Sequence, residues 1–565
     1  MLMIPATTLS PFALCAALPL QWQQSYDPTH HWWLSTLFAA LPLLALLIAL
    51  LGLRMKAHLS ALVALAVAII VALGLFHMPV GLASLATLYG AAYGLFPVFW
   101  IIFPVIFLYQ LTIRAGRFQL LQDCLVGVTE DSRLQLLLIA FAFGAFFEGA
   151  SGFGTPVAVC GTILIGLGFA PLEAAGLALL ANTAPVAFGA LGTPVIALGG
   201  VTGLNTLLLT RVIAALLTPF CVIVPFWLIW AYAGFKRMIE IWPAILLTGV
   251  TFALTQLLMA TFHGPWLVDI TASVVTIAVL VLFLRFWRPK TILTTARETV
   301  AHRTDNSARQ AGHVIRRAAL PWVILAVFVT IWGSPSIERA ISAATTLLIP
   351  VPGLNKVVFR MPPAVPTMTA EAAVFNFNWL SATGTGILIA AIIAALLMKL
   401  KPKDIVEVFG KAAYSTRFTM ITIASLMGLG FLTRFCGLDA TLGLAFARTG
   451  VLYPFFGTMI GWLGTASTGS DTSSNVLFGS LQKLTAQQLN ISPYLMTGAN
   501  SGGGVMGKMV APQSVVVAST ATGCYGKEGS IIRFVILHSL ALTCLMGLLV
   551  SLVVYSPTLT KLLLQ

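Results

Sequence analysis

The sequence predicts an all-α protein that crosses a membrane many times and contains interrupted helices. Of its 565 residues, 59% are hydrophobic and only 8% are charged, and the mean hydropathy is +0.97. A soluble domain carries about 25% charged residues, so an ordinary water-solvated surface is excluded. Apolar runs of about 20 residues, the length that crosses a bilayer, recur along the chain. Two of the apolar stretches are also interrupted by the same pattern of polar residues, glycine and proline.

Nine apolar runs are the clearest candidates for membrane spans. They cover residues 34–53, 59–76, 96–113, 212–230, 242–262, 266–286, 318–332, 380–398 and 531–555. An earlier run, 11–20, follows no Lys or Arg and has no small-residue cleavage site. We therefore interpret it as an extracytoplasmic flank and not as a secretory signal.

The net charge of +14 could suggest nucleic-acid binding, but the positions of the cations explain it more simply. Lys and Arg gather at the ends of apolar runs, as at Arg54 and Lys56. This is the positive-inside distribution, which places those loops in the cytoplasm. The flanks 21–33 and 77–90 contain neither residue type, so we expect them outside. Both chain ends then lie outside, which requires an even number of crossings.

Polar segments divide the chain into two halves. We expect a first transmembrane half at 1–287, a cytoplasmic connector at 288–317 and a second transmembrane half at 318–565. Within the second half, 333–378 contains six prolines and is expected to be an extracytoplasmic loop.

The repeated interruption lies once in each half. The first copy contains Asn182 and Thr183, and the second contains Asn500 and Ser501. In both copies a glycine follows the Asn by seven residues and a proline follows it by twelve. These residues suit a helix broken at membrane depth, where freed backbone groups can hold a ligand. Paired breaks of this kind are the best sequence pointer to the binding site of a secondary transporter.

An Ala-Ser turn precedes each copy, at Ser151-Gly152 and at Ser467. Residues 144–203 around the first turn include thirteen glycines, each costing about 1 kcal/mol in a helix interior relative to Ala. Close packing of spans through small residues explains many of them. It does not explain the Ser151-Gly152 turn or the Asn-Thr pair.

Ionisable residues inside apolar sequence require a reason, since a charge at the centre of a membrane helix costs about 2.5–3.5 kcal/mol. Glu148, Asp471 and Lys508 all lie beside the motifs. Arg434 ends a long apolar run, where snorkelling to the interface is expected. Asp269, close to Trp266, is also expected at the membrane interface.

Longer stretches around the motifs are distinctive. They are FFEGASGFGTP at 146–156, ANTAPVAFG at 181–189, Gly192-Thr193-Pro194, GSDTSSN at 469–475, MVAPQ at 509–513, and the segments 22–28 and 377–385. Through them, over nearly its whole length, the sequence resembles the lactate permease family of bacterial carboxylate transporters. One departure from symmetry is that Thr183-Ala184-Pro185 corresponds to Ser501-Gly502-Gly503, which predicts an asymmetric pocket.

The resemblance implies proton-coupled uptake of L-lactate, with D-lactate and glycolate as related substrates, across the bacterial inner membrane. It also implies about 12 transmembrane segments in two inverted repeats with re-entrant hairpins, and a homodimer. No cofactor or metal ion is implied.

These expectations assign roles to the residues of the motifs. Half-helix amino termini at the Asn182 and Asn500 breaks would offer N–H groups to the anion. The remaining candidates for substrate binding are Ser151, Gly152, Thr183, Ser467, Ser501 and Lys508, the last as the point charge for the carboxylate. Glu148 and Asp471 are the candidates for carrying the proton. Alternatively, one of the two simply neutralises Lys508, because charges inside membranes usually pair.

Other classes of protein fit less well. The sequence contains no catalytic motif of the HExxH or GxSxG type, and its seven cysteines form no CxxC or Cys/His cluster. We therefore expect neither an enzyme nor a metal site. A sodium-coupled di- or tricarboxylate carrier of the same architecture is the closest alternative, followed by an anion channel built from glycine-rich re-entrant loops.

Overall fold

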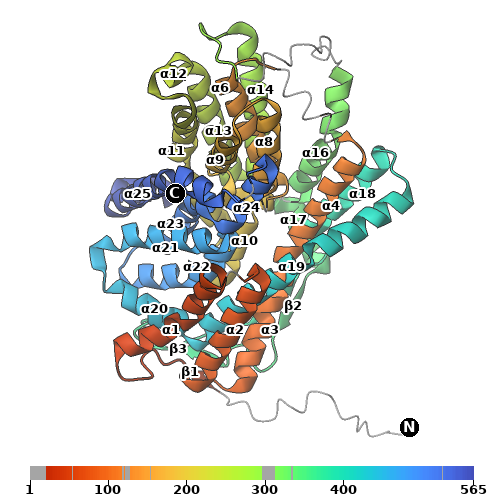
Figure 1. Cartoon of the computed structure of the whole chain (residues 1–565). Coiled ribbons are helices and arrows are strands. Elements are labelled where there is room, and N and C mark those ends of the chain that lie inside the picture. The colour runs from red at the N-terminus through yellow and green to blue at the C-terminus, as the bar shows by residue number, and fades with distance from the viewer. Residues whose placement is uncertain are drawn as a thin grey trace, which may run out of the picture.

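The fold is almost entirely helical and is known from a computed structural model (Figure 1). The structure describes residues 21–53, 55–117, 120, 128–152, 154–295, 312–332, 335–524 and 526–564. The predicted flank 11–20 and most of the predicted connector, 296–311, lie outside these ranges.

The first half contains helices of very different lengths. In chain order these are α1 (Trp32–Leu47), η2 (Ile48–Gly52), α2 (Ala57–Gly74), α3 (Val80–Tyr93), η3 (Gly94–Phe99), α4 (Trp100–Arg114), α6 (Ser132–Gln135), η4 (Leu136–Phe143), α7 (Gly144–Ala150), α8 (Thr155–Gly166), α9 (Pro171–Ala181), η5 (Val186–Phe188), α10 (Gly189–Thr202), α11 (Thr206–Ala233), α12 (Phe235–Glu240), α13 (Trp242–Phe262) and α14 (Val268–Phe286).

The second half repeats much of this pattern. Its helices are α16 (Gly312–Trp332), α17 (Pro335–Thr345), α18 (Thr383–Leu397), α19 (Pro402–Cys436), α20 (Leu438–Ala447), η7 (Gly450–Leu452), α21 (Tyr453–Thr468), α22 (Asp471–Gln488), α23 (Pro493–Gly507), η8 (Lys508–Val510), α24 (Pro512–Thr522), α25 (Glu528–Tyr555) and α26 (Pro557–Leu564).

Among the described residues, eight helices or helix runs are long and apolar enough to cross a bilayer. They are α2, Val80–Arg114, Ser132–Ala150, α11, α13, α14, α19 and α25. A ninth is α9 with η5 and α10, which bend by 66° at their break. The polytopic all-α fold is therefore confirmed, while the number of 12 crossings stays a prediction. The expected outer flank at 77–90 is largely helical, because α3 begins at Val80 and continues into the same long run. Its position on the outer side stays a prediction.

Each half contains one hairpin followed by one interrupted helix. In the first half α6 to α7 and α8 form the hairpin, and the α9–α10 pair follows. In the second half α21 and α22 form the hairpin, and the α23–α24 pair follows. The two Ala-Ser turns of the sequence are the tips of these hairpins.

The loop predicted at 333–378 has structure of its own. After α17, β2 (Leu347–Pro350) pairs antiparallel with β5 (Val374–Phe377). β3 (Val358–Arg360) lies between β1 (Trp22–Gln23) and β4 (Thr369–Ala370), parallel to the first and antiparallel to the second. The amino-terminal segment is thereby attached to the second half.

The two halves are interlocked. Helix α8 of the first hairpin packs on α24, and α22 of the second hairpin packs on α10. Helix α9 likewise contacts α25, and helix α11 contacts α23. In Figure 1 the blue helices α21 to α25 accordingly lie between the olive α11 to α13 and the red α1 to α3. Each hairpin tip therefore meets the break contributed by the other half.

Candidate functional site

The tip of the first hairpin is a tight turn that glycine makes possible. Gly152 and Gly154 have φ values of +59° and +84°, which side chains with a Cβ rarely adopt. A Cβ on Gly152 would lie 3.2 Å from the Cβ of Ala190, and one on Gly154 would lie 3.4 Å from Val517 of α24. The tip therefore touches both the first break and the second half.

The first interrupted helix breaks where the sequence predicts. Helix α9 ends at Ala181, and Asn182 is its C-cap. Pro185 disfavours helical backbone at the residue before it and has no N–H to donate. Beyond it, Ala190, Leu191 and Gly192 all take left-handed backbone angles.

The second break is shorter and lies later than predicted. We expected it at Asn500, but α23 runs unbroken from Pro493 to Gly507, so Asn500 is inside a helix. The break comes at Lys508–Val510, and Ala511 is extended before Pro512. The expected half-helix terminus at Asn500 is therefore wrong. The physical reason is that 502–504 are glycines and not the proline found in the first copy, so the helix continues.

An ion pair joins the two halves beside the first break. The Nζ of Lys508 donates to Oε1 of Glu148 at 2.6 Å, with side-chain exposures of 10% and 2%. The Nδ2 of Asn182 donates to the other carboxylate oxygen of Glu148 at 3.0 Å. A Cβ on Gly189 would lie only 2.5 Å from Oε1 of Glu148. The carboxylate is thus held between Lys508, Asn182 and a glycine backbone.

Two polar atoms beside this pair have no partner in the described structure. They are Oδ1 of Asn182 and Oγ1 of Thr183, both buried. Buried polar groups nearly always form hydrogen bonds, so an unpartnered amide oxygen and an unpartnered hydroxyl on successive residues make this a candidate place for a ligand.

A second polar cluster surrounds Asp471 at the start of α22. Its Oδ2 accepts from Oγ of Ser501 at 2.6 Å and from Nδ2 of Asn475 at 3.2 Å, and its Oδ1 accepts from Oγ1 of Thr465 at 3.5 Å. The Nδ2 of Asn500 donates to Oδ1 of Asn475 at 2.9 Å. Among the predicted residues, Asp471, Ser501 and Asn500 therefore belong to one buried network.

This network extends beyond the predicted residues. The Nε2 of Gln482 donates to Oδ1 of Asn500 at 3.2 Å, and the hydroxyl of Tyr453 donates to Oε1 of Gln482 at 2.7 Å. Asn475 also donates to the carbonyl of Pro194 in α10 at 3.3 Å. Asn475 connects the second hairpin to the first break, and its spacing of four from Asp471 on one helix is the signal that could have found it.

The serines of the two tips contribute less than predicted in this conformation. The Oγ of Ser151 donates to the carbonyl of Phe147 at 3.0 Å, and that of Ser467 to the carbonyl of Leu463 at 2.6 Å. Both hydroxyls bind their own helix, as Ser often does at membrane depth. Their role in binding substrate stays a prediction.

Arg434 and Asp269 have surroundings that sequence reasoning did not foresee. The Nη2 of Arg434 pairs with Oε2 of Glu371 at 2.9 Å, which ties the end of α19 to the loop between α16 and α18. Asp269 is 1% exposed and packs against Gly149, next to the hairpin tip. The expectation that Asp269 lies at the membrane interface is therefore wrong.

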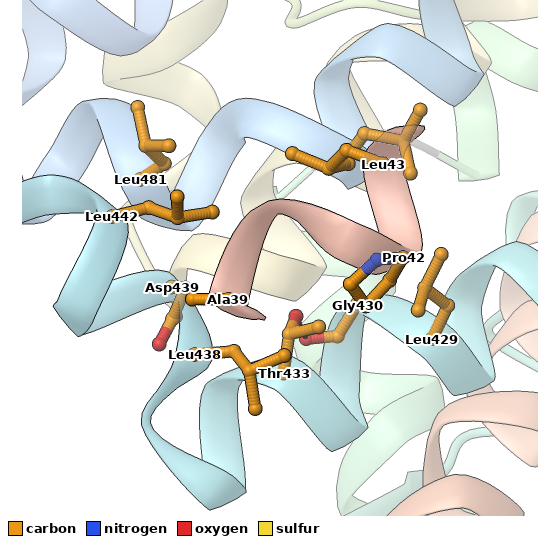
Figure 2. A pocket seen from close by; sticks show the side chains of 11 residues that line it. Ala39, Pro42, Leu43, Leu429, Gly430, Thr433, Leu438, Asp439, Leu442 and Leu481 are labelled. Atoms are coloured by element: carbon orange, nitrogen blue, oxygen red, sulfur yellow. Dashed lines mark hydrogen bonds between the residues drawn. The ribbon is translucent and has the colours of Figure 1, made fainter. Parts of the chain in front are cut away.

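A small cavity lies elsewhere, between α1, α19, α20 and α22. Figure 2 shows its mostly apolar lining, including Leu43, Leu442 and Leu481, with Asp439 at one side. None of the predicted site residues lines it. This cavity is therefore separate from the site. No group of three or more potential metal ligands occurs among the described residues.

Two hairpins and two interrupted helices that meet inside a polytopic membrane protein define a secondary transporter with one buried site. The sequence matches the family described as L-lactate permease over residues 35–556. The chain belongs to this family, and it is a multi-pass protein of the bacterial inner membrane.

Individual relatives agree with this assignment. The chain is 42% identical to an L-lactate permease of Escherichia coli (strain K12) over 545 residues, covering 95% of this chain and 99% of that protein. It is also 42% identical to the glycolate permease GlcA of the same organism, covering 94% and 98%. An L-lactate permease of Bacillus subtilis (strain 168) is 40% identical, covering 93% and 97%. A solved structure of Neisseria gonorrhoeae MtrF, from a class of antimetabolite efflux pumps, matches 80% of this chain and 81% of that chain at 12% identity and a TM-score of 0.42.

Proposed function

We propose that the protein imports L-lactate, with D-lactate and glycolate as related substrates, by symport with protons. The observation that carries the proposal is the buried pair of Lys508 and Glu148, to which Asn182 is also bonded. Lys508 provides a cation that can bind the carboxylate of a monocarboxylate, and Glu148 provides an acid that can bind a proton. The names of the permeases that the chain resembles support L-lactate and glycolate as substrates.

Competition for Lys508 supplies a mechanism of coupling. A 2-hydroxycarboxylate that enters the site replaces Glu148 as the partner of the Lys508 ammonium. Glu148 then lies at membrane depth without a counter-ion, and an unpaired charge there is costly. It binds a proton, so that one proton accompanies one anion. The unpartnered atoms of Asn182 and Thr183 are suited to bind the hydroxyl of the substrate.

Asp471 is the second acid that we propose for the proton step. It is buried at the tip of the other hairpin, and Lys508 attracts it over a longer distance than a direct ion pair. Ser501 and Asn475 hold the carboxylate in place. Movement of either hairpin tip would change these contacts.

Uptake of labelled lactate into vesicles that contain the purified protein tests the proposal. The pH gradient and the sodium gradient are imposed separately, and accumulation is expected with the pH gradient alone. Accumulation that follows only the sodium gradient would overturn proton symport. The predicted homodimer is tested in the same vesicles by cross-linking.

A further inference from the structure

The molecule contains a third buried carboxyl group next to the site, and its surroundings differ from those of the other two. Asp269 lies in the first turn of α14. It is 1% exposed, and neither of its carboxylate oxygens has a hydrogen-bond partner in the described structure. Glu148 has both a cation and an amide, and Asp471 has three donors. Asp269 has none.

The backbone of the hairpin tip fixes where Asp269 lies. A Cβ on Gly149 would lie 2.7 Å from the Cβ of Asp269 and 3.1 Å from the amide nitrogen of Ile270. Gly149 directly follows Glu148, so the absence of a side chain there allows α14 to approach the ion pair. The turn before α14 also reaches the first break, because a Cβ on Gly192 would lie 2.4 Å from Pro265.

Few charged groups face Asp269. Glu148 from α7 and Lys508 from η8 both act on it electrostatically, and so does the thiol of Cys221 in α11. His263 lies in the turn that leads into α14. The neighbouring helices α10, α13 and η4 contain no titratable side chain. Among the described residues, Lys508 is the one cation that acts on Asp269, and it is already bound to Glu148.

A carboxylate ion in these surroundings would have neither counter-ion nor hydrogen bond, which is the most costly state for a charge inside a membrane protein. The neutral acid avoids this cost. The buried and unpartnered carboxyl group of Asp269 is therefore suited to the neutral, protonated form, whereas the carboxyl group of Glu148 faces the Lys508 ammonium.

We propose that Asp269 is the group that loads the transported proton and delivers it to Glu148 when the substrate takes over Lys508. The O–H bond of Asp269 breaks, its electron pair stays on the carboxylate, and the proton passes through an intervening water to an oxygen of Glu148. Asp269 is then reprotonated from the external side. Once the site faces the cytoplasm, the substrate leaves, Lys508 returns to Glu148 and Glu148 releases its proton. The proposal rests on proton symport as proposed above.

The test compares Asp269→Asn with Asp439→Asn in reconstituted vesicles. Asp439 is a matched control, because it too is buried in the first turn of a helix and has an unpartnered carboxylate oxygen, but it lies at the separate cavity. For Asp269→Asn we expect lactate exchange at equal pH within about threefold of the unaltered protein. Accumulation driven by a pH gradient, and proton uptake on addition of lactate, should both fall at least tenfold. Asp439→Asn should retain lactate exchange, accumulation driven by a pH gradient, and proton uptake on addition of lactate.

Each outcome distinguishes this proposal from proton symport itself. If the unaltered protein shows no accumulation with a pH gradient, the proposed function fails. If the unaltered protein accumulates lactate and Asp269→Asn does so equally well, the assignment of Asp269 fails alone. If Asp269→Asn cannot be reconstituted, Asp269→Glu serves instead. This variant keeps a carboxylic acid but changes its position. It should shift the dependence of accumulation on external pH and leave that of exchange unchanged. An unchanged pH dependence of accumulation would overturn the assignment.

Discussion

The Nζ of Lys508 lies 2.6 Å from Oε1 of Glu148, although 360 positions separate the two residues in the chain. The pair is the only one among the described ion pairs that connects a hairpin tip of the first half to the break of the second. It therefore has two functions at once. It attaches the halves to each other, and in the proposed mechanism it also holds the cation that binds the carboxylate of the substrate.

Replacement of Lys508 by Ala should abolish exchange of labelled lactate, because the substrate loses its counter-charge. It should also destabilise the protein by about 3–5 kcal/mol, since removal of one partner leaves a buried charge unpaired. Counterflow in vesicles and thermal unfolding in detergent measure the two effects.

The double variant Lys508→Ala with Glu148→Gln separates the loss of exchange from the loss of stability. It removes both charges, so the melting temperature should return toward that of the unaltered protein while exchange stays absent. Exchange by Lys508→Ala at the normal rate would contradict the role of this lysine.

Replacement of Glu148 by Gln should leave exchange and remove accumulation driven by a pH gradient, because the amide cannot titrate. Asp471→Asn is expected to behave in the same way, and it retains an oxygen that can accept from Ser501. Uptake with and without an imposed pH gradient measures both. Full accumulation by either variant would show that the replaced residue does not couple transport to the movement of protons.

Replacement of Gly189 by Ala should displace the Glu148 carboxylate, because the new Cβ would lie 2.5 Å from its Oε1. We expect accumulation driven by a pH gradient to fall about tenfold, which corresponds to ~1.4 kcal/mol. Gly74→Ala is the matched control, since a Cβ there meets nothing within 4 Å. It lies at the end of α2 and should leave transport unchanged. Equal rates for both variants would mean that the carboxylate has room to move.

The ion pair of Glu371 predicts a pH-dependent stability outside the spans. Burial raises the pKa of the Glu371 carboxyl, but Arg434 and Arg360 lower that pKa by more, so the net shift is downward. A lowered pKa stabilises the fold above the unfolded-state value of about 4.3, and this contribution is lost as the pH falls through the folded-state pKa.

Glu371→Gln should therefore lower the melting temperature at neutral pH. The difference from the unaltered protein should begin to shrink as the pH falls below about 4.3, and it should disappear below the lowered pKa of Glu371. Glu407→Gln is the control, because Glu407 forms an exposed pair with Lys411. Such pairs contribute little, so its melting curve should hardly change. A difference for Glu371→Gln that is constant with pH would refute the electrostatic account.

Sequence reasoning identified the elements that build the candidate site but not their full geometry. The paired motifs identify both hairpin tips and the first break, since glycine and proline restrict the backbone locally. The second break was placed at Asn500 because spacing alone does not show that three glycines can continue a helix up to Lys508. Asp269 was misplaced for a different reason. Its burial depends on Gly149, a contact across the fold that no local pattern contains.

The interlocking of α8 with α24 and of α10 with α22 has a consequence for how the protein is made. Glu148 leaves the ribosome and enters the bilayer long before Lys508 has been translated. During that interval its side chain has no cation from the second half, so the nascent chain must carry it as an uncharged acid or keep it in water. The ionised form of Glu148 gains its counter-ion only when the last third of the polypeptide has been inserted. Where Glu148 enters the bilayer as the neutral acid, assembly of the transporter ends with the deprotonation that the proposed mechanism also places at the end of each transport cycle.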